Sequence, residues 1–592
     1  MCVTKYAILR AASMPYHWHR HGGMRMKKKV APALAVILLI VVVVGIGFLT
    51  RLIQKYTPSS EVMDSQEYFG LDSDDEAAIV IGSEILSYKG KLIGDVAYVD
   101  YQAVKETLND YFYWDSDNNT MLYTMPTDVV QIPAGTGSYT ADGKTQDLTY
   151  NIVLIDGSKT YIALDFVKQY TAISYEVFQE PNRIVINNEW GDVTVASIRK
   201  KGKVRTLGGI KSPILREVEK NEVVRILEPM EDWTKILTQD GYIGYIKNDR
   251  LVKEHTETLT TDFTAPEYTS IVKDYKINLV WHQTTSMDAN YNIIYDIASV
   301  KKVNTISPTW FSIASNDGTL DSLALADYVD TAHDNDMEVW PLVDNFSENI
   351  DFAQVMNTTS ARNKIENQLI AAAIEYSFDG INVDFENISE DAADGYVQFV
   401  RELSVMCRKN GIALSVDVPV PMDFTAHYNR KALGEVCDYV IIMGYDEHYA
   451  GSEEAGSVAS LSFEEEGIQN TLTDVPAAKI ISGIPFYTRL WCTTTNADGT
   501  TTVTSDALGM NDAQQVLENN QAESTWDETT QQNYAQFEGE DGALYQIWLE
   551  DTKSLTKKLE LIKNYNLAGV AEWKLGLEDD SVWDLIAKYI SS

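Results

Sequence analysis

The sequence predicts an α/β protein whose C-terminal half is a (β/α)8 barrel. A small β-barrel, a small α+β repeat module and one N-terminal transmembrane helix precede that half. In residues 270–592, eight short apolar runs alternate with helical stretches, which is the arithmetic of a (β/α)8 barrel. In residues 77–253, shorter runs alternate apolar and polar residues between turn signals, which indicates small β-rich modules.

The first element is the uncharged apolar segment at residues 30–50, which is long enough to cross a bilayer as a helix. Residues 1–29 carry seven Lys and Arg and no acidic residue, so we expect a cytoplasmic tail and an extracellular catalytic domain. A cleaved signal peptide is the alternative, but the apolar run is long for one and no A-x-A site follows. Residues 51–76 read as an acidic spacer. The formal net charge of -39 argues against nucleic acid as a partner.

An internal repeat marks the next module, residues 77–190. Residues 98–124 align without gaps to residues 161–187, an offset of 63, and each copy reads as strand, amphipathic helix and strand pair. The pattern resembles the small α/β module at the N-terminus of copper amine oxidases. The resemblance implies a spacer or binding module, and no copper chemistry is carried over.

Residues 193–253 contain five short β-runs, with Trp233, a turn at Asp240-Gly241 and the strand GYIGYI. This region resembles a bacterial SH3-like domain. In exported proteins such domains often contact cell-wall peptide or polysaccharide, and a purely structural role is equally open. A Thr- and Glu-rich linker follows at residues 254–269.

The expected barrel strands are eight apolar runs, separated by helical stretches such as residues 394–411. A doubly wound open sheet is the alternative arrangement. The gap before the last strand is long enough to hold an insertion at about residues 491–548. The strand candidates are residues 277–282, 304–311, 338–343, 380–385, 413–418, 438–443, 479–484 and 568–573.

The fourth strand candidate, 378-FDGINVDFEN-387, carries acidic residues on an apolar run. Since side chains alternate along a strand, Asn382, Asp384 and Glu386 share one face. A row of an amide and two carboxylates on a buried strand is costly unless the groups are hydrogen-bonded or used for chemistry. The C-terminal ends of barrel strands surround the active site of such enzymes, so Asp384 and Glu386 are expected at the rim of a pocket.

Other strand ends bring aromatic and polar groups to the same rim. Aromatic faces cover the apolar side of a sugar ring, while carboxylates and amides bind its hydroxyl groups, so a sugar polymer suits this rim. The expected rim residues include Trp281, Trp310, Asp344, Asn345, Phe346, Asp417, Met443, Tyr445, Asp446, Tyr487 and Trp573, and Asn382 is also expected to contact the substrate.

The motif 379-DGINVDFE-386 resembles the D-G-x-D-x-D-x-E signature of glycoside hydrolase family 18, the chitinase-like enzymes. The segment 443-MGYDEH-448 and Trp573 match two further family motifs. The resemblance implies a retaining, substrate-assisted mechanism with no cofactor or metal. In that mechanism Glu386 is the acid and base, Asp384 orients the acetamido group and raises the pKa of Glu386, and Tyr445 binds the acetamido carbonyl.

The resemblance also implies that Asp446 and Met443 help to seat the sugar and that Trp573 forms the floor of the central subsite. Asp379 is expected to be structural, capping the strand or binding nearby backbone.

Two departures from the family pattern point to one branch of it. Asn382 stands where the family has its middle aspartate, and 341-PLVDNFS-347 replaces the usual S-x-G-G. An amide cannot share a proton with Asp384, so the pH profile is expected to differ. Both departures resemble the bacterial spore-cortex-lytic N-acetylglucosaminidases, whose target is peptidoglycan. Chitinase activity, or sugar binding without hydrolysis on the same barrel, remains an alternative.

Overall fold

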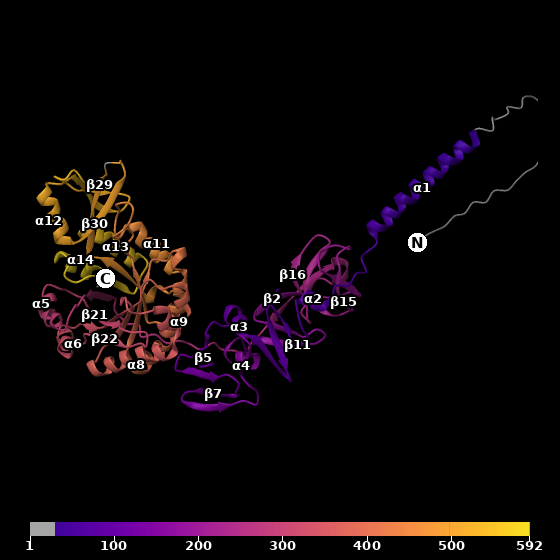
Figure 1. Ribbon diagram of the computed structural model, residues 1–592, viewed down its shortest axis with the longest axis horizontal. Coiled ribbons are helices and arrows are strands. Elements are labelled where there is room, and N and C mark those ends of the chain that lie inside the picture. The colour runs from indigo at the N-terminus through magenta and orange to yellow at the C-terminus, as the bar shows by residue number, and fades with distance from the viewer. Residues whose placement is uncertain (1–29, 497, 591–592) are drawn as a thin grey trace, which may run out of the picture. The chain divides into compact units, whose positions relative to one another are not determined.

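Eight parallel strands close into a barrel in the computed structural model, which describes residues 30–496 and 498–590 (Figure 1). The first strand pairs with the second on one side and with the last on the other, so the sheet has no edge and the open-sheet alternative is wrong. The strands in order are β20 (Ile277–His282), β21 (Thr305–Ile313), β24 (Leu342–Asp344), β25 (Gly380–Asp384), β26 (Ala413–Pro419), β27 (Tyr439–Met443), β28 (Ile480–Pro485) and β34 (Gly569–Trp573).

The barrel strands bury both of their faces, as their nearly continuous apolar runs require. One face of β25 packs Ile381, Val383 and Phe385 against the surrounding helices. The inner faces of the strands fill the barrel with large side chains, among them Trp281 and Tyr439. The period-two alternation read from the sequence therefore sends Asn382 and Asp384 into the barrel interior.

Helices form a layer around the barrel strands. The helix expected at residues 394–411 is α9 (Glu390–Asn410), and it ends at Gly411, which adopts a left-handed φ of 70°. The other helices of this layer are α5 (Ile293–Asp296), α6 (Ala326–His333), α7 (Phe352–Asn357), α8 (Thr359–Tyr376), α10 (Arg430–Val436), α11 (Leu461–Thr471), α13 (Thr552–Asn564) and α14 (Ser581–Ile590).

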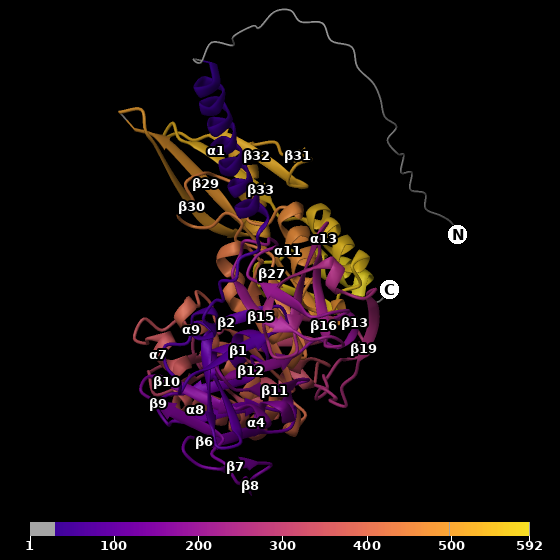
Figure 2. The ribbon, with the colours of Figure 1, turned by 90° about the vertical axis from the view of Figure 1, so that its right-hand side faces the viewer.

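An antiparallel sheet is inserted between the seventh and eighth barrel strands, and Figures 1 and 2 show it at one end of the barrel. It begins at Tyr487, four residues before the predicted start. Its strands run in the order β30-β29-β33-β32-β31, and α12 (Met510–Asn520) packs with them. The strands are β29 (Tyr487–Thr495), β30 (Thr501–Gly509), β31 (Thr525–Asp527), β32 (Gln532–Glu538) and β33 (Leu544–Leu549).

The upstream repeat is visible in the helices α3 (Tyr101–Thr107) and α4 (Leu164–Tyr170), which begin 63 residues apart, the offset of the sequence alignment. Each follows a strand, β3 (Val96–Asp100) or β10 (Lys159–Ala163), and these two strands pair with each other. The strands after the helices are β4 (Phe112–Asp115) and β5 (Thr120–Thr124) in one copy, and β11 (Ser174–Phe178) and β12 (Arg183–Asn187) in the other.

Residues 70–190 and the barrel belong to one compact unit, and an arginine joins them. The guanidinium of Arg401 on α9 lies 3.8 Å from the ring centroid of Tyr111. It also donates to the backbone carbonyl and to the carboxylate of Asp110, both at 2.9 Å. A stacked and hydrogen-bonded arginine of this kind holds the repeat module against α9.

The second unit joins the N-terminal helix to the small β-barrel. The five predicted β-runs of that barrel form five short strands: β14 (Gly202–Arg205), β15 (Ile214–Val218), β16 (Val223–Pro229), β17 (Trp233–Thr238) and β18 (Ile243–Lys247). The N-terminal helix is α1 (Val30–Tyr56). Its stretch Leu34–Tyr56 has the length and composition of a membrane span or a signal sequence. The predicted cytoplasmic tail, residues 1–29, lies outside the described residues.

Closure of the barrel imposes a glycine at position 569. A β-carbon there would collide with the backbone carbonyl of Ile277 on the neighbouring strand β20. We expect Gly569→Ala to lower the free energy of unfolding by about 1–3 kcal/mol, because the backbone must move to relieve the clash. Thermal denaturation measures this. Gly209→Ala, where nothing lies within 4 Å of the added β-carbon, is the matched control and should leave the stability nearly unchanged.

Candidate active site

The predicted acidic pair stands at the C-terminal end of β25. Asp384 is the last residue of the strand and is 4% exposed, while Glu386 lies two residues beyond it and is half-buried. Asn382, two residues before Asp384, lies deeper in the barrel and is fully buried, so it is not exposed to bind the substrate as the sequence predicted. The three side chains therefore run from the barrel interior to its mouth, as the alternation of the strand predicts.

Asn382 is the centre of a hydrogen-bond network that crosses the barrel. Its Oδ1 accepts from the Trp281 indole at 2.9 Å and from the Ser307 hydroxyl at 3.1 Å. Its Nδ2 donates to Asp417 Oδ1 at 2.7 Å and to Ser415 Oγ at 3.1 Å. The amide is thereby fully hydrogen-bonded and cannot rotate without breaking contacts to three other strands.

The carboxylate of Asp384 is buried, and one of its two oxygens accepts no hydrogen bond from the described residues. Among the described residues, its Oδ1 is buried and has no hydrogen-bond partner. Burial raises the pKa of Asp384 well above its ordinary value, and the charges of Asp417, Glu386 and Asp344 act in the same direction. A buried, unpartnered carboxylate oxygen is costly in isolation, so it is suited to receive a donor from a bound molecule.

Glu386 is held through its backbone by Asn345, which follows the third barrel strand. The amide of Glu386 donates to Asn345 Oδ1 at 3.0 Å, and Asn345 Nδ2 donates to the carbonyl of Glu386 at 2.9 Å. Burial raises the pKa of the Glu386 carboxyl, with further contributions from Asp446 and Asp344. The charge of Glu386 likewise raises the pKa of Asp384, because two carboxylates this close disfavour each other's ionisation.

The expected residues of the sixth, seventh and eighth strand ends gather beside this pair. The ring centroid of Tyr445 lies 6.2 Å from that of Tyr487. Burial raises the pKa of Tyr445 well above its ordinary value, and the charges of Asp384 and Asp417 add to the rise. The hydroxyl of Tyr487 donates to the carboxylate of Asp446.

Two aromatic rings at the mouth, Tyr445 and Trp573, pack on the buried Trp281 inside the barrel. The centroid of the Trp281 ring lies 6.5 Å from that of Tyr445 and 5.8 Å from that of Trp573, both edge-to-face. Met443, the last residue of β27, is half-buried at the same end of the barrel.

Two other expected residues lie at opposite ends of the barrel: Phe346 near the mouth and Asp379 at the far end of β25. Phe346 is 53% exposed and follows the third strand, where its amide donates to Asp344. Asp379 lies just before β25, and its carboxylate accepts from the amide of Val339 and contacts the ring of His333, each at 2.8 Å. Asp379 thus binds backbone at the end of the strand away from the site.

Trp310 is not part of the group, although the sequence placed it at the rim. It is 2% exposed and packs in the core between the strands and the helices, where its indole donates to Asn290. Its ring centroid lies 4.9 Å from that of Tyr328. A buried side chain in this position has no free face for a sugar ring.

The sequence placed Asp344, Asn345 and Asp417 at the rim without a particular role, and it did not single out Ser415. Asp417 and Ser415 receive the Asn382 amide, Asn345 holds the Glu386 backbone, and Asp344 adds its charge next to Asp384. The position of Ser415 inside a predicted strand gave no signal of this role.

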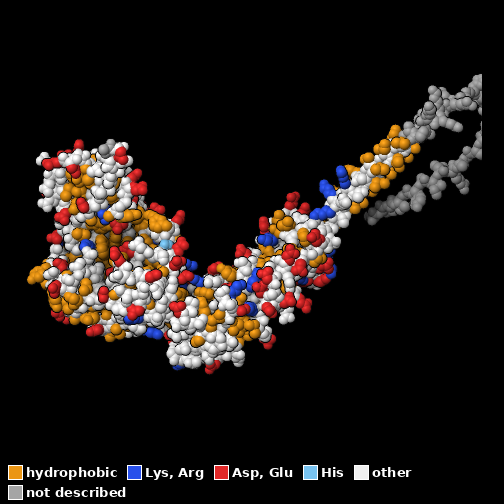
Figure 3. Space-filling model, in the orientation of Figure 1, with side chains coloured by type: hydrophobic (Ala, Val, Ile, Leu, Met, Phe, Trp, Pro, Cys, Tyr) orange, Lys and Arg blue, Asp and Glu red, His pale blue; other side chains and the backbone are white. Residues whose placement is uncertain are grey.

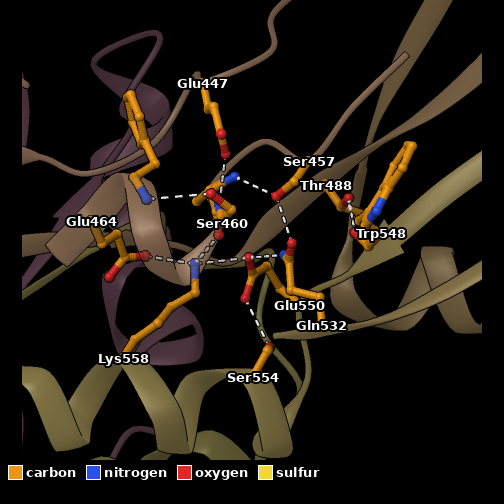
Figure 4. Close-up of polar contacts among 12 residues, drawn as sticks. Glu447, Ser457, Ser460, Glu464, Thr488, Gln532, Trp548, Glu550, Ser554 and Lys558 are labelled. Atoms are coloured by element: carbon orange, nitrogen blue, oxygen red, sulfur yellow. Dashed lines mark hydrogen bonds and ion pairs between the residues drawn. The ribbon is translucent and has the colours of Figure 1, made fainter. Parts of the chain in front are cut away.

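A buried lysine supports the loop that carries Tyr445 and Asp446 (Figure 4). Lys558 on α13 is 1% exposed and donates to the carbonyl of Ala459 at 2.7 Å. It forms ion pairs with Glu464 at 2.5 Å and with Glu550 at 3.0 Å. The loop from Asp446 to Ser460 thus ends on a charge network that also includes the inserted sheet.

Further hydrogen bonds extend this network at both ends. Glu447, the residue after Asp446, accepts from the amide of Ser460 at 2.8 Å. On the side of the insertion, Gln532 donates to Glu550 at 2.7 Å and accepts from Ser457.

The arrangement supports proton transfer at a sugar. A half-buried carboxyl group with a raised pKa holds its proton to a higher pH than an exposed one, as a general acid requires, and a second carboxylate beside it can stabilise positive charge. Aromatic rings line the same mouth. Within the described ranges, no cluster of three or more His, Cys, Asp and Glu side chains is arranged to hold a metal ion.

A barrel with an acidic pair at the C-terminal end of its fourth strand and an aromatic wall beside it defines a hydrolase of glycosidic bonds. The chain belongs to the glycosyl hydrolases family 18, whose profile matches residues 276–578, about half of its length. The profile of the bacterial SH3 domain matches residues 201–252, which confirms the second resemblance.

Three similar proteins come from bacilli. The glycosylase YvbX of Bacillus subtilis (strain 168), described as uncharacterized, is 27% identical over 317 residues, 52% of this chain and 89% of that protein. The cortical fragment-lytic enzyme of the same organism is 27% identical over 239 residues, 39% of this chain and only 54% of that enzyme. The spore cortex-lytic enzyme SleL of Bacillus megaterium QM B1551 has a solved structure that aligns with a TM-score of 0.47 at 20% identity, over 56% of this chain and 77% of SleL.

Because Lys558 is the buried cation of this network, we expect its replacement to lower the stability of the protein strongly. Lys558→Met would leave the buried carboxylates of Glu464 and Glu550 without their cation, which typically costs about 3–5 kcal/mol. Chemical denaturation measures the change. Lys557→Met is the matched control, because Lys557 on the same helix pairs with Glu560 at the surface, and it should change the stability by less than about 1 kcal/mol. Equal effects of the two substitutions would contradict the role of Lys558.

Proposed function

We propose that this protein hydrolyses the bonds that follow N-acetylglucosamine in cell-wall peptidoglycan, by a retaining and substrate-assisted mechanism. The observation that carries the proposal is the pairing of two unlike carboxyl groups at the barrel mouth. Glu386 is half-buried with a raised pKa, and Asp384 is buried with one oxygen free of partners among the described residues.

In the first step the Glu386 carboxyl protonates the oxygen of the glycosidic bond. The free Asp384 oxygen accepts a hydrogen bond from the N–H of the sugar's acetamido group, and the hydroxyl of Tyr445 donates to its carbonyl oxygen. That carbonyl oxygen attacks the anomeric carbon as the bond to the leaving sugar breaks, which forms an oxazolinium ion. The negative charge of Asp384 stabilises this positive ring.

In the second step Glu386, now ionised, removes a proton from water as the water attacks the anomeric carbon. Two inversions at this carbon give net retention. The Asn345 clamp holds the Glu386 backbone in one position for both proton transfers. Trp573 and Tyr487, with Asp446, Met443 and Phe346, are the groups proposed to hold the sugar.

Three observations favour the cell wall as the location of the substrate. The apolar helix α1 has the composition of an anchor, and the basic tail before it favours a cytoplasmic N-terminus. The second module matches the bacterial SH3 domain. Two of the similar proteins are named for lysis of the spore cortex or of its fragments. We therefore propose a single-pass membrane protein whose barrel faces the wall.

Removal of the proton donor tests the chemistry. Glu386→Gln should lower the rate of glycan cleavage about 10²–10⁴-fold, because Gln cannot transfer a proton, and it should leave the fold intact. Release of reducing sugar from purified peptidoglycan measures the rate. Glu375→Gln, an exposed residue of α8, is the control and should cleave at the wild-type rate. If wild type and Glu386→Gln release equal amounts, or if neither releases any, the hydrolysis proposal is wrong.

The nature of the substrate follows from the fragments that are released. Mass spectrometry of products from peptidoglycan should show N-acetylglucosamine at the new reducing ends. Faster cleavage of chitin oligomers than of peptidoglycan would instead indicate a chitinase.

The amide at position 382 should set the acidic limb of the pH profile. In Asn382→Asp a third carboxyl group faces Asp417 and Asp384, so their pKa values rise further and Asp384 ionises only at higher pH. We expect the acidic limb of kcat/KM to move up by about one pH unit or more. Asn410→Asp adds the same charge at the exposed end of α9 and should leave the limb in place. An unmoved limb in Asn382→Asp would argue against control of Asp384 by this network.

A further inference from the structure

The end of α1 is fastened to the small β-barrel rather than joined to it by a free linker. Lys211, in the loop between β14 and β15, donates from its ammonium to the carbonyl of Thr57 at 2.5 Å and also to that of Gln54. The amide of Ser59 donates to the carbonyl of Ile210 at 2.8 Å. The β14–β15 loop, residues 206–213, therefore lies against the last turn of the helix.

A groove of about 380 Å³ opens beside this junction. It is lined by Pro58, two residues after the helix, and by the half-buried ring of Trp233. Its charged lining is one carboxylate, Glu217, against five cations: Lys201, Lys203, Arg205, Lys247 and Arg250. The ammonium of Lys247 lies 5.8 Å from the Trp233 ring centroid. In a chain with 87 acidic and 48 basic residues, a groove with this balance of charge is suited to an anion.

Not every cation of the groove is available to a ligand. Arg205 is buried and donates to the carbonyls of Ser212 and Ser59. Lys201 is paired with Glu217 at 2.8 Å and with Glu219 at 2.7 Å. Lys203 forms only a long ion pair with the same Glu217, at 3.9 Å, and its side chain is 44% exposed. Lys203 and Lys247 are therefore the side chains positioned to bind an anion.

The length of α1 sets the depth of the groove relative to a bilayer. Residues 30–50, the uncharged run, span about 31 Å as a helix, which matches a hydrocarbon core of about 30 Å. Residues 51–56 continue the helix for about 9 Å, through a headgroup layer of about 5–8 Å. Pro58 and the groove then lie at the outer border of the headgroups, within reach of a lysine side chain.

The side of the module next to the helix carries the residues that a membrane surface favours. Leu207, in the loop that contacts α1, is 66% exposed. Arg51 and Lys55 stand in the last turns of the helix, and Figure 3 shows Lys and Arg side chains in blue where α1 meets this unit. Lysine binds phosphate as a point charge, and tryptophan is enriched at membrane–water interfaces.

We propose that this groove binds the phosphate headgroup of an anionic phospholipid in the outer leaflet. Lys203 and Lys247 contact the phosphate, Trp233 packs beside it, and the exposed Leu207 faces the headgroup layer. The inference rests on the proposed membrane anchor and goes beyond it, because it gives the small β-barrel a lipid ligand and a fixed face toward the membrane.

The test uses the full chain in lipid nanodiscs made of phosphatidylcholine alone or with one third phosphatidylglycerol. Amide hydrogen exchange of residues 203–211 and 243–250 is expected to slow several-fold only in the anionic discs, and the effect should weaken in high salt. The double variant Lys203→Gln/Lys247→Gln should lose the protection. The matched variant Lys220→Gln/Lys253→Gln removes two exposed charges outside the groove and should keep it.

Equal exchange in the two kinds of disc, or protection that survives in Lys203→Gln/Lys247→Gln, would overturn the proposal. Protection by soluble poly(glycerol phosphate) in neutral discs, without an effect of phosphatidylglycerol, would assign the groove to a wall polymer and not to lipid.

Two further readouts separate this inference from the proposed function. A chain that does not remain with the discs would overturn both the anchor and the lipid site. Cleavage of soluble peptidoglycan fragments, measured on the same samples, tests the barrel alone. The groove variants are expected to retain it, and its absence in every sample would refute the hydrolase proposal without bearing on the groove.

Discussion

The hydrogen bonds of Asn382 are the constraint on which the site depends. The barrel interior is filled mainly by apolar and aromatic side chains, yet it contains the carboxyl groups of Asp384 and Asp417. The Asn382 amide alone ties Asp417 to an indole and two hydroxyl groups from three other strands. Because every donor and acceptor of that amide is used, the polar centre keeps one geometry, and the unpaired oxygen of Asp384 remains for the substrate.

The barrel and the acidic pair could be predicted because their signals are local. Alternation along one strand decides which residues face inward, and β25 follows it without interruption from Gly380 to Asp384. Trp310 was misplaced because it was assigned by its position at the end of a strand and not by the face that it occupies. Ser307 points into the barrel and bonds Asn382, so alternation along β21 sends Ile306 and Trp310 toward the helices, where both of them pack.

The supporting contacts could not be predicted because they join residues that are far apart in the chain. Asn345 and Glu386 are separated by 41 positions, and Lys558 and Ala459 by 99. Neither an asparagine after a strand nor a lysine in an amphipathic helix indicates, from the sequence alone, which distant residue it will bind. Lys558 occupies an inward position of α13, where a hydrophobic residue is the usual expectation, and only the folded chain shows the two carboxylates that make a charge tolerable there.

The Lys558 network also determines how the inserted sheet relates to the barrel. Glu550 follows β33 directly and Gln532 begins β32, so the sheet supplies part of the shell around a cation that belongs to a barrel helix. A shortened chain that joins β28 directly to α13 would lack Glu550 and would leave the buried Lys558 with one of its two counter-charges. The inserted sheet therefore cannot be removed alone, and a minimal version of this enzyme would need Lys558 and Glu464 replaced together.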